Sequence, residues 1–419
     1  MLGAVAMTGL LWVGVGLLPW IGLGVFLTLG IREPRTLPPA PGSDDLSTAG
    51  TEEAGAEDLG PLVSIIIPAR NEASRIGRCI EGLGRFHGVP YEIIVVDDRS
   101  TDDTAQVARE QEPGAALRLQ VVDGRRLPEG WFGKPWACRQ GADVARGRLL
   151  LFVDADTTHE PELLSRTLAA MEEDDAQVLS LLGRQEVGTF GEKLVQPQVF
   201  TLIGLRFRKL DQVVDPSRWK DAIANGQFVL VTRDAYESIG GHEAVKGEVV
   251  EDLRLAQELT RAGSRLTVRE GEEVFATRMY TSMRELVNGW TKNVAVGARQ
   301  ASGRWAGLVL PGILLFLSFF WLLPAVAVGW AGLGWVAGGA GAGFAFPLWA
   351  GVAWAMCVVI WAGAYHRFRV SPAMAFLYPL GTLVVAFIVL RSWFRGERRI
   401  EWKGRRYQEG VVVKEPSRG

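Results

Sequence analysis

Paired carboxylates that follow short apolar runs are the side chains best suited to chemistry in this 419-residue sequence. Asp154 and Asp156 come directly after the apolar run 149–153, with Ala155 between them. In an extended chain, residues two positions apart point to the same side, so the two carboxylates would lie close together and repel each other. A divalent cation that also contacts substrate phosphates would remove this repulsion. The spacing therefore indicates a cation site, and an ordinary acidic loop at a strand end is the alternative.

A second pair, Asp97 and Asp98, follows the run 92–96. Carboxylates at this place can accept hydrogen bonds from a base or a ribose. The polar run from Ser100 to Asp103 comes next, and Ser and Asp are favoured caps of helix N-termini. We therefore interpret the run as a cap for the next helix, and Asp97 and Asp98 as candidates for binding.

Polar side chains also follow the first predicted strand, which ends at Pro68. We expect Pro68 to stop the ladder and to turn the chain toward the next helix. Arg70 and Glu72 come just after this turn. They either face the ligand crevice or line a surface turn.

Charged side chains stand at two predicted helix N-termini. Lys134 is unfavourable in such a position unless an anion, for example a diphosphate, lies nearby. Glu251 and Asp252 are favourable there, because the helix macrodipole stabilises negative charge. Dipole compensation therefore explains this acidic pair as well as a catalytic role does.

These residues depend on an α/β domain that we predict between residues 61 and 304. Short β-branched runs alternate there with amphipathic stretches. The expected strands are 63–67, 92–96, 117–122 and 149–153, and the expected helices are 74–85, 103–111 and 135–145. Apolar runs on both sides of polar helices predict a mostly parallel sheet that is covered on both faces. In such sheets the ligand crevice lies beyond the carboxyl ends of the strands.

The composition changes sharply along the chain. Residues 2–31 are uncharged and long enough to span a bilayer, and Arg32 and Arg35 follow them. This order favours an anchor over a cleaved signal peptide and places the next domain in the cytosol. The predicted segments are a transmembrane anchor (1–31), a flexible linker (32–60), a soluble α/β domain (61–304), a C-terminal transmembrane region (305–390) and a basic cytosolic tail (391–419).

Three uncharged segments, 307–337, 344–364 and 373–390, make up the C-terminal region. The first is longer than a bilayer requires and contains two prolines, so it is either kinked or a short hairpin. The basic tail favours the cytosol, but three simple spans after a cytosolic domain would place the tail outside. A double crossing by the long segment and a re-entrant segment both stay open.

Several classes of protein are excluded. Lys and Arg total 45 against 47 for Asp and Glu, which argues against a nucleic-acid binder that works by bulk charge. The turn after the first strand has no glycine, so it lacks the Gly-x-Gly-x-x-Gly motif of nicotinamide enzymes. No Gly-x-Ser-x-Gly is present, which argues against a serine hydrolase. Three widely spaced cysteines imply neither a zinc site nor disulfides, and fit a reducing compartment.

Taken together and in order, the motifs resemble glycosyltransferase family 2, whose members have the GT-A fold. The similarity covers residues 62–304, and the motifs are Ile67-Pro68 with Asn71-Glu72, Val96-Asp97-Asp98, Gly133-Lys134, Asp154-Ala155-Asp156, Asn225-Gly226-Gln227-Phe228, Gly240-Gly241-His242 and Glu251-Asp252. The segments 130–137 and 288–293 resemble one membrane branch of the family. That branch includes enzymes that glycosylate carotenoid acids of the diaponeurosporenoate type, and relatives associated with hopanoids.

The resemblance implies a UDP- or GDP-sugar donor and a role for each matching residue. The residues implied to line the nucleoside pocket are Pro68, Ala69, Arg70, Glu72, Asp97 and Asp98. The residues implied to lie near the donor's phosphates are Lys134, Asp154, Ala155, Arg278 and Lys292. Asp154 and Asp156 would hold Mg²⁺ or Mn²⁺, and Asp252 would be the general base with Glu251 beside it. An acceptor that is already an ionised carboxylate would depend less on Asp252.

The expected activity is an inverting, metal-dependent transfer of a single sugar to a lipid of the carotenoid, hopanoid or polyprenyl type. It would take place at the cytosolic face of the plasma membrane. A processive polysaccharide synthase is one alternative, but the Gln-x-x-Arg-Trp motif of processive members is one residue too long at Gln300–Trp305. A membrane scaffold without activity is the other, and the intact acids argue against it.

Overall fold

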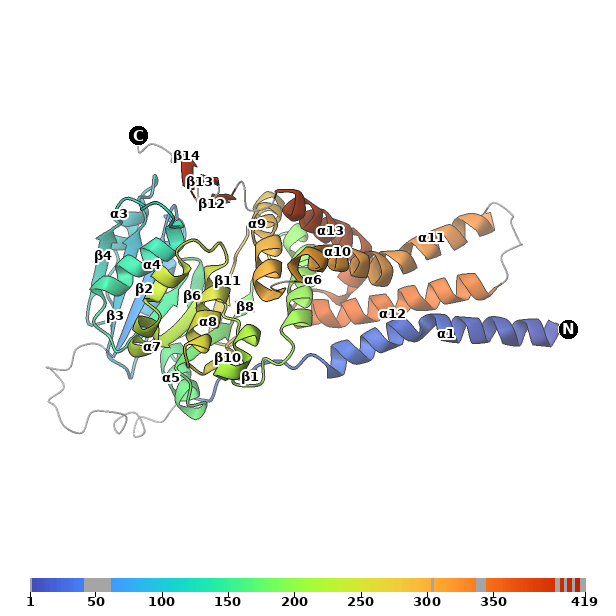
Figure 1. The fold of residues 1–419 in the computed structure, drawn as a ribbon, viewed down its shortest axis with the longest axis horizontal. Helices are drawn as coiled ribbons and strands as arrows, with labels where there is room; N and C mark the ends of the chain where they lie inside the picture. The colour runs from blue at the N-terminus through green and yellow to red at the C-terminus, as the bar shows by residue number, and fades with distance from the viewer. Residues whose placement is uncertain are drawn as a thin grey trace. The chain divides into compact units, whose positions relative to one another are not determined.

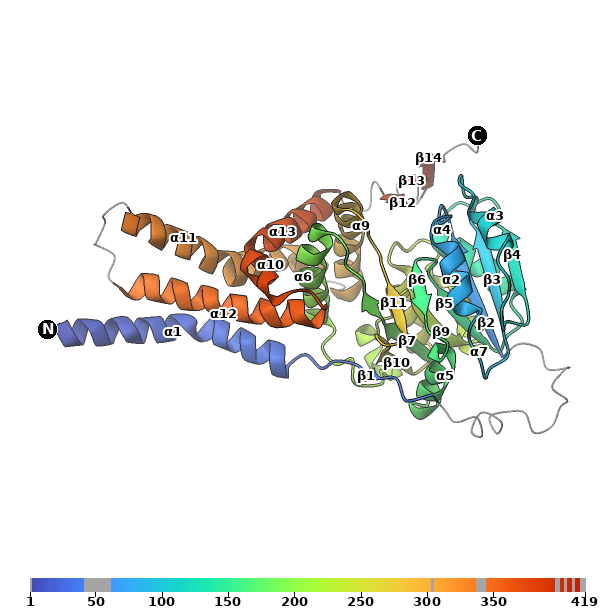
Figure 2. The same cartoon turned by 180° about the vertical axis from the view of Figure 1, so that it is seen from behind.

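The computed structural model divides the chain into two compact units (Figures 1 and 2). It describes residues 2–40, 62–302, 305–336, 344–395, 400–402, 405–408 and 411–414. The sheet unit comprises Glu33–Glu186, Lys209–Met279 and Arg395–Gly419. The helical unit comprises Met1–Arg32, Val187–Arg208 and Tyr280–Phe394.

An eight-stranded sheet forms the centre of the sheet unit, in the order β1-β10-β7-β9-β5-β2-β3-β4. Its strands are β1 (Arg35–Thr36), β2 (Val63–Ala69), β3 (Tyr91–Asp97), β4 (Leu119–Asp123), β5 (Leu149–Val153), β7 (Val178–Leu182), β9 (Phe228–Thr232) and β10 (Leu266–Glu270). All neighbours are parallel except β9, which is antiparallel to β5 and β7. The prediction of a mostly parallel sheet is therefore confirmed.

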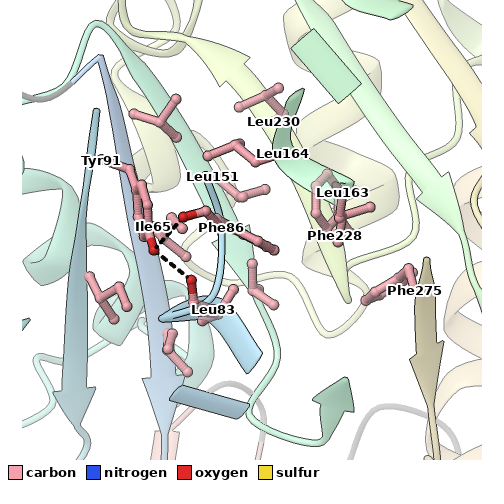
Figure 3. Close-up of a cluster of buried hydrophobic side chains, with 14 of the residues drawn as sticks. Ile65, Leu83, Phe86, Tyr91, Leu151, Leu163, Leu164, Phe228, Leu230 and Phe275 are labelled. Carbon is pink, nitrogen blue, oxygen red and sulfur yellow. Dashed lines mark hydrogen bonds between the residues drawn. The ribbon is translucent and has the colours of Figure 1, made fainter. Parts of the chain in front are cut away.

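Alternate residues of the central strands enter two apolar clusters, because successive side chains of a strand point to opposite faces. Ile65 belongs to one cluster and Ile66 to the other. Figure 3 shows the first cluster, where the Tyr91 hydroxyl donates a 2.8 Å hydrogen bond to the Leu83 carbonyl. The helices that contribute to this cluster are α2 (Ile76–Leu83), α3 (Thr104–Arg109) and α5 (Leu163–Glu173). Those that contribute to the other are α4 (Gly133–Val144), α7 (Arg233–Ser238) and α8 (Glu251–Arg261).

Smaller elements complete the sheet unit. A three-stranded sheet contains β6 (Thr157–His159), β11 (Phe275–Thr277) and β8 (Arg184–Gln185). A second one is formed by the tail strands β12 (Ile400–Trp402), β13 (Arg405–Gln408) and β14 (Val411–Lys414). The short helices are η1 (Pro216–Asp221) and η2 (Gly241–Val245).

Two local predictions were wrong. Pairing of β2 with β3 continues through Pro68 to Ala69, so Pro68 does not stop the ladder. The proline is tolerated because pairing with β5 already ends at Ile66, which leaves this end of β2 paired on one side. The prediction that the run from Ser100 to Asp103 caps the next helix is confirmed, because the N-cap of α3 is Asp103, although the side chain of this residue makes no capping bond. Asp102 accepts the Thr104 N–H instead, at 3.2 Å.

The second error concerns the predicted linker, which is ordered at its start. Arg35–Thr36 form β1 beside β10, and Leu37 is buried in the apolar core. Burial of this leucine and strand pairing offset the entropy cost that we expected to keep the segment disordered. Residues 41–61 of the predicted linker lie outside the described residues.

The helical unit contains four helices that are long and apolar enough to cross a membrane. These candidate spans are Leu10–Leu29, Gly307–Leu333, Ala345–Arg367 and Pro372–Phe394. The helices of the unit are α1 (Leu2–Leu29), α6 (Phe190–Arg206), α9 (Met283–Ser302), α10 (Ala306–Phe316), the π-helical η4 (Leu317–Leu322), α11 (Leu323–Val336), α12 (Ala345–Arg367), η5 (Pro372–Leu377) and α13 (Tyr378–Arg395). Within the unit, α12 lies beside both α1 and α11 (Figures 1 and 2).

The long apolar segment is one continuous candidate span with a π-helical stretch, and the hairpin alternative is excluded. A π-helical stretch disturbs the regular pattern of backbone hydrogen bonds, and a free carbonyl is costly in an apolar setting. The Phe320 carbonyl in this stretch accepts a bond from the Trp20 indole at 2.9 Å and one from the Cys357 thiol at 3.3 Å. Trp20 thereby fastens α1 to the C-terminal helices.

The two compact units divide the chain at other positions than the predicted segments do. Helices α6 and α9 were expected in the soluble domain, but both belong to the helical unit. The side-chain amide of Gln198 on α6 donates to the Tyr365 hydroxyl of α12 at 3.0 Å, and Ser392 of α13 donates to the Thr291 carbonyl of α9 at 2.6 Å. The tail from Arg395, in contrast, belongs to the sheet unit.

Candidate active site

The carboxyl ends of three neighbouring strands carry the acidic side chains singled out above. Asp97 is the last residue of β3, and Asp154 directly follows β5. Strand β2 lies between β3 and β5, and the chain order reverses at this point of the sheet. Ligands of doubly wound sheets bind at such a switch point. These acidic side chains therefore lie at the edge of the sheet where we predicted the ligand crevice, and ligand binding there stays a prediction.

Lys134, in the first turn of α4, joins the two acidic groups. Its Nζ lies 2.8 Å from an Asp154 carboxylate oxygen and 3.0 Å from a Glu251 carboxylate oxygen. It also donates to the Gly226 carbonyl at 3.2 Å. The anion expected beside this lysine is thus supplied, within the described chain, by two carboxylates that come from β5 and α8.

Asp252 is held by backbone donors next to this lysine. Its Oδ2 accepts the Gly226 N–H at 2.8 Å, and its Oδ1 accepts the Leu253 N–H at 2.8 Å. Gly226 leaves just enough room, because an added Cβ there would lie 2.7 Å from Asp252 Oδ2. Gly226 therefore touches both the lysine and the candidate base, which explains a glycine at this position of the Asn-Gly-Gln-Phe motif.

Burial and neighbouring charges shift the pKa values of Asp252 and Lys134. Burial and the neighbouring Glu251 raise the pKa of the Asp252 carboxyl to about 6, while Lys134 acts in the opposite direction. Burial lowers the pKa of Lys134, but Asp154 and Glu251 outweigh burial and raise it well above the ordinary value. The lysine is therefore charged at neutral pH, and Asp252 changes its charge just below neutral pH, as suits a general base.

A hydrogen-bonded turn fixes the backbone of Asp154. The Thr157 hydroxyl donates to the Asp154 carbonyl at 2.6 Å and lies 3.1 Å from His159 Nε2. Strand β6, which contains both residues, pairs antiparallel with β11, with Thr277 opposite Thr157. Arg278 follows the last paired residue of β11, and its closeness to the phosphate end of the site stays a prediction.

The donor set fits a divalent cation that is completed by substrate. Within the described ranges, no group of three or more His, Cys, Asp or Glu side chains forms a metal site of its own. Asp154 and Asp156 together offer two carboxylates on one turn, and Ala155 between them is buried. Mg²⁺ in phosphate-transferring sites is held in this way, by one or two carboxylates, phosphate oxygens and water. The chemistry of the residues therefore fits Mg²⁺ or Mn²⁺ brought together with a diphosphate.

The predicted nucleoside edge is a pair of tightly joined turns. Arg70 is buried and donates to the carbonyls of Asp98 and Arg99 at 2.5 and 2.9 Å. Asn71 receives the Thr101 N–H at 2.8 Å, and Glu72 donates its N–H to the Thr104 hydroxyl at 2.8 Å. These bonds fix the turn after β2 against the turn after β3.

The carboxylates of this edge have different surroundings. Asp97 accepts the Ser100 N–H at 3.3 Å with each of its oxygens. Asp98 is completely buried and forms an ion pair with Arg405 from the C-terminal tail. Burial raises the pKa of Asp98 to about 6 despite the opposing effect of Arg405. Arg405 was missed at the sequence level because it lies 307 positions away along the chain, in a stretch where a basic residue simply indicates the cytosol.

Three other predicted residues have less specific surroundings. Ala69 is buried, and its carbonyl accepts the Asp98 N–H at 2.7 Å. Lys292 lies on α9 of the helical unit, so its contact with the donor stays a prediction. His242 of the Gly-Gly-His motif is buried, stands 2.8 Å from the Tyr236 hydroxyl and packs on Phe152. Its contacts are those of a core residue, and burial lowers its pKa to about 3.

Comparison with known proteins shows which proteins this chain resembles. Residues 64–240 match the family described as glycosyl transferase family 2. The chain is also 31% identical over 239 residues to 4,4'-diaponeurosporenoate glycosyltransferase from Staphylococcus aureus strain USA300. This match covers 56% of the chain and 61% of that relative, so about three fifths of the relative's length is represented. Over these residues the chain is similar to glycosyltransferase family 2 and to a carotenoid-type glycosyltransferase.

The fold agrees with this similarity to glycosyltransferases. The structure is similar to that of a mannosyltransferase from Pyrobaculum calidifontis in complex with GDP-Man and Mn²⁺, with a TM-score of 0.52. The similarity covers 95% of this chain and 100% of the other at 19% sequence identity, so it concerns the fold alone. The predicted fold class, a GT-A domain with a mostly parallel sheet and apolar helices at both ends, is confirmed.

Proposed function

We propose that this protein transfers a single sugar from a UDP- or GDP-sugar to a lipid acceptor, with inversion at the sugar carbon. The carotenoid acid in the name of the Staphylococcus aureus relative supports a lipid-like acceptor. The four apolar helices support a site that works beside a membrane. The GDP-Man and Mn²⁺ bound to the archaeal mannosyltransferase illustrate the class of donor and cation that a GT-A fold accommodates.

One observation carries the proposal: a single lysine joins the candidate metal ligand to the candidate base. Lys134 lies within 3.0 Å of both Asp154 and Glu251. It donates a hydrogen bond to the Gly226 carbonyl, and the N–H of the same glycine donates one to Asp252. These residues come from four separate stretches of the chain and meet at the carboxyl end of the sheet. A site that handles a diphosphate and a proton at once would use such a cation between two acidic groups.

The reaction uses these residues in distinct roles. The acceptor oxygen bonds to the anomeric carbon of the sugar while the bond from this carbon to the diphosphate breaks. Asp252 takes the proton of an acceptor hydroxyl, and Lys134 offsets the negative charge that collects near Asp154. A divalent cation bound by Asp154 and Asp156 would neutralise the leaving diphosphate. The nucleoside diphosphate leaves, and the sugar is inverted because the acceptor attacks from the opposite face.

The tail supports an orientation in the membrane. Because Arg405 is buried in the sheet unit, the tail and this unit lie on the same side of the membrane. The three apolar C-terminal helices therefore supply an even number of crossings. Helix α13 is the one we assign as not crossing, since its Thr382 and Ser392 bond to α6 and α9, which are not candidate spans. Arg32 and Arg35 after the first span favour the cytosolic face of the plasma membrane.

The test is a donor-cleavage assay on the full chain in detergent. The purified protein is incubated with Mn²⁺ or Mg²⁺, a panel of nucleotide sugars and a membrane lipid extract, and released nucleoside diphosphate is measured. We expect release that depends on lipid, stops with EDTA and disappears in Asp156→Ala. Asp234→Asn, which alters an exposed carboxylate of α7, is the matched control and should behave like the parent.

The products distinguish the proposal from its alternatives. Mass spectrometry should find lipids that carry one added sugar. Chains of several sugars would show a processive synthase. An absence of both nucleotide binding and release across the panel would contradict the enzyme proposal and favour a scaffold.

A further inference from the structure

The C-terminal tail contributes a completely buried arginine to the edge of the sheet where the nucleoside is predicted to bind. Arg405 is the first residue of β13 and has 0% of its surface exposed, as has Asp98. Arg405 Nη1 contacts Asp98 Oδ2, and Nη2 lies 3.1 Å from Oδ1. Two parallel contacts between a guanidinium and a carboxylate are strong and fix direction as well as distance. A tail that was merely solvated would not bury a charge in this way.

The backbone of the same turn is held by a second arginine. Arg70 donates to the Asp98 carbonyl at 2.5 Å, and Arg405 Nη2 lies 3.5 Å from this carbonyl. The next residue, Arg99, has a φ of +56°, in the left-handed region that L side chains rarely adopt. Such a conformation persists where surrounding contacts over-determine it, often next to a ligand. Arg70 and Arg405 supply contacts of this kind to the turn.

The position of the turn connects it with the donor. Asp97 and Ser100, on either side of Asp98 and Arg99, are joined through the carboxylate of Asp97. We propose that Arg405 is a positioning residue of the donor site, which holds Asp98 so that the turn from Asp97 to Ser100 keeps the shape that binds the nucleoside. In this arrangement Asp98 engages the tail, and nucleoside recognition depends on Asp97. The inference rests on the proposed function and adds a role that the sequence did not assign to the tail.

This role predicts an effect on donor binding and little effect on the chemical step. The Asp97–Ser100 turn follows β3, whereas Lys134 and Asp252 belong to α4 and α8. Contacts to the nucleoside are the same before and during sugar transfer, so their loss raises KM and leaves kcat nearly unchanged. A residue needed for folding alone would change thermal stability without this split between KM and kcat.

The experiment compares Arg405→Gln with the loss of another arginine that pairs with a buried carboxylate. Arg118→Gln is the control, because Arg118 lies 2.5 Å from the fully buried Glu92 near the other end of β3. For Arg405→Gln we expect the donor KM and the Kd of UDP or GDP to rise by about tenfold, with kcat within about twofold of the parent. Arg118→Gln should melt earlier than the parent but keep the parental KM. Arg405→Lys keeps the charge without the two-pronged contact and should fall between Gln and the parent.

Two further outcomes are defined in advance. If Arg405→Gln does not fold, because Asp98 is left buried without a counter-charge, the double variant Asp98→Asn/Arg405→Gln takes its place and should still bind nucleotide weakly. If a folded Arg405 variant, single or double, keeps the parental KM and Kd, this inference is overturned but the proposed function is not. Absence of nucleotide binding by the parent protein would overturn the proposed function and this inference with it.

Discussion

Replacing the candidate base should make the protein more stable while it destroys activity toward hydroxyl acceptors. Asp252 has an ordinary pKa of 3.8 that burial and Glu251 raise to about 6. The folded protein thus holds the Asp252 proton more tightly than the unfolded chain does. The contribution to stability is present below about pH 4 and is lost as pH rises through about 6. Asp252→Asn removes the charge, so the variant does not lose this stability as pH rises.

The size of the effect follows from the shift. A shift of one pKa unit corresponds to about 1.4 kcal/mol, so a rise of about two units gives at most roughly 3 kcal/mol at pH 7 and above. Asp252 keeps some exposure to solvent, which reduces the expected gain to roughly 1–2 kcal/mol. In a folded unit of this size, the melting temperature should rise by roughly 3–6 °C.

The assay is thermal unfolding of the purified protein in detergent at several pH values between 4 and 8. The melting temperature of Asp252→Asn minus that of the parent should be near zero at pH 4 and should grow to its full value by pH 7. The exposed Asp234→Asn should show no such growth with pH. A difference that is independent of pH, or a variant that melts below the parent at pH 8, would refute the assignment of a strained carboxylate at this position.

Three further predictions concern the same cluster. Lys134→Met removes the cation between Asp154 and Glu251, and sugar transfer should fall by about 100-fold or more in the donor-cleavage assay; a loss below tenfold would contradict the role of the lysine. Gly226→Ala places a Cβ 2.7 Å from Asp252 Oδ2, so kcat should drop while the melting temperature changes by a few degrees at most, and a parental kcat would speak against the geometry. With a hydroxyl acceptor, kcat/KM should rise with pH through about 6 and then level off, because Asp252 must lose its proton; a flat profile would exclude Asp252 as the base.

The fold was predictable because its pattern is local. Ile65 and Ile66 belong to opposite apolar clusters, so a continuous apolar run already indicates a strand that is buried on both faces. The order β4-β3-β2-β5 then sets the strand ends side by side. The antiparallel β9 and the boundary between the two units were not predictable in this way. They depend on contacts such as Gln198 with Tyr365, between residues 167 positions apart.

The features of the site differ in the same way: some depend on local sequence, and others depend on contacts between distant residues. Asp154, Asp97 and Asp252 could be chosen as candidates because each ends or follows a strand or opens a helix, and these local signals can be read in the sequence. The ion pairs of Lys134 with Asp154 and Glu251 required the fold, since they join residues from α4, β5 and α8. Arg405 gave no local signal of its role: the basic tail that contains it is explained equally well by membrane orientation.

The response of Asp252 also bears on the class of acceptor. A carotenoid acid would present a carboxylate that is already ionised near neutral pH, so no base would be needed to activate it. Asp252 would then still contribute its hydrogen bond from Gly226 and its share of the negative charge around Lys134. Asp252→Asn would gain stability and keep most of its activity toward a carboxylate lipid, yet lose roughly 10²–10⁴-fold toward a hydroxyl lipid. The same variant, tested on both kinds of lipid, therefore separates the two acceptor classes independently of the sugar.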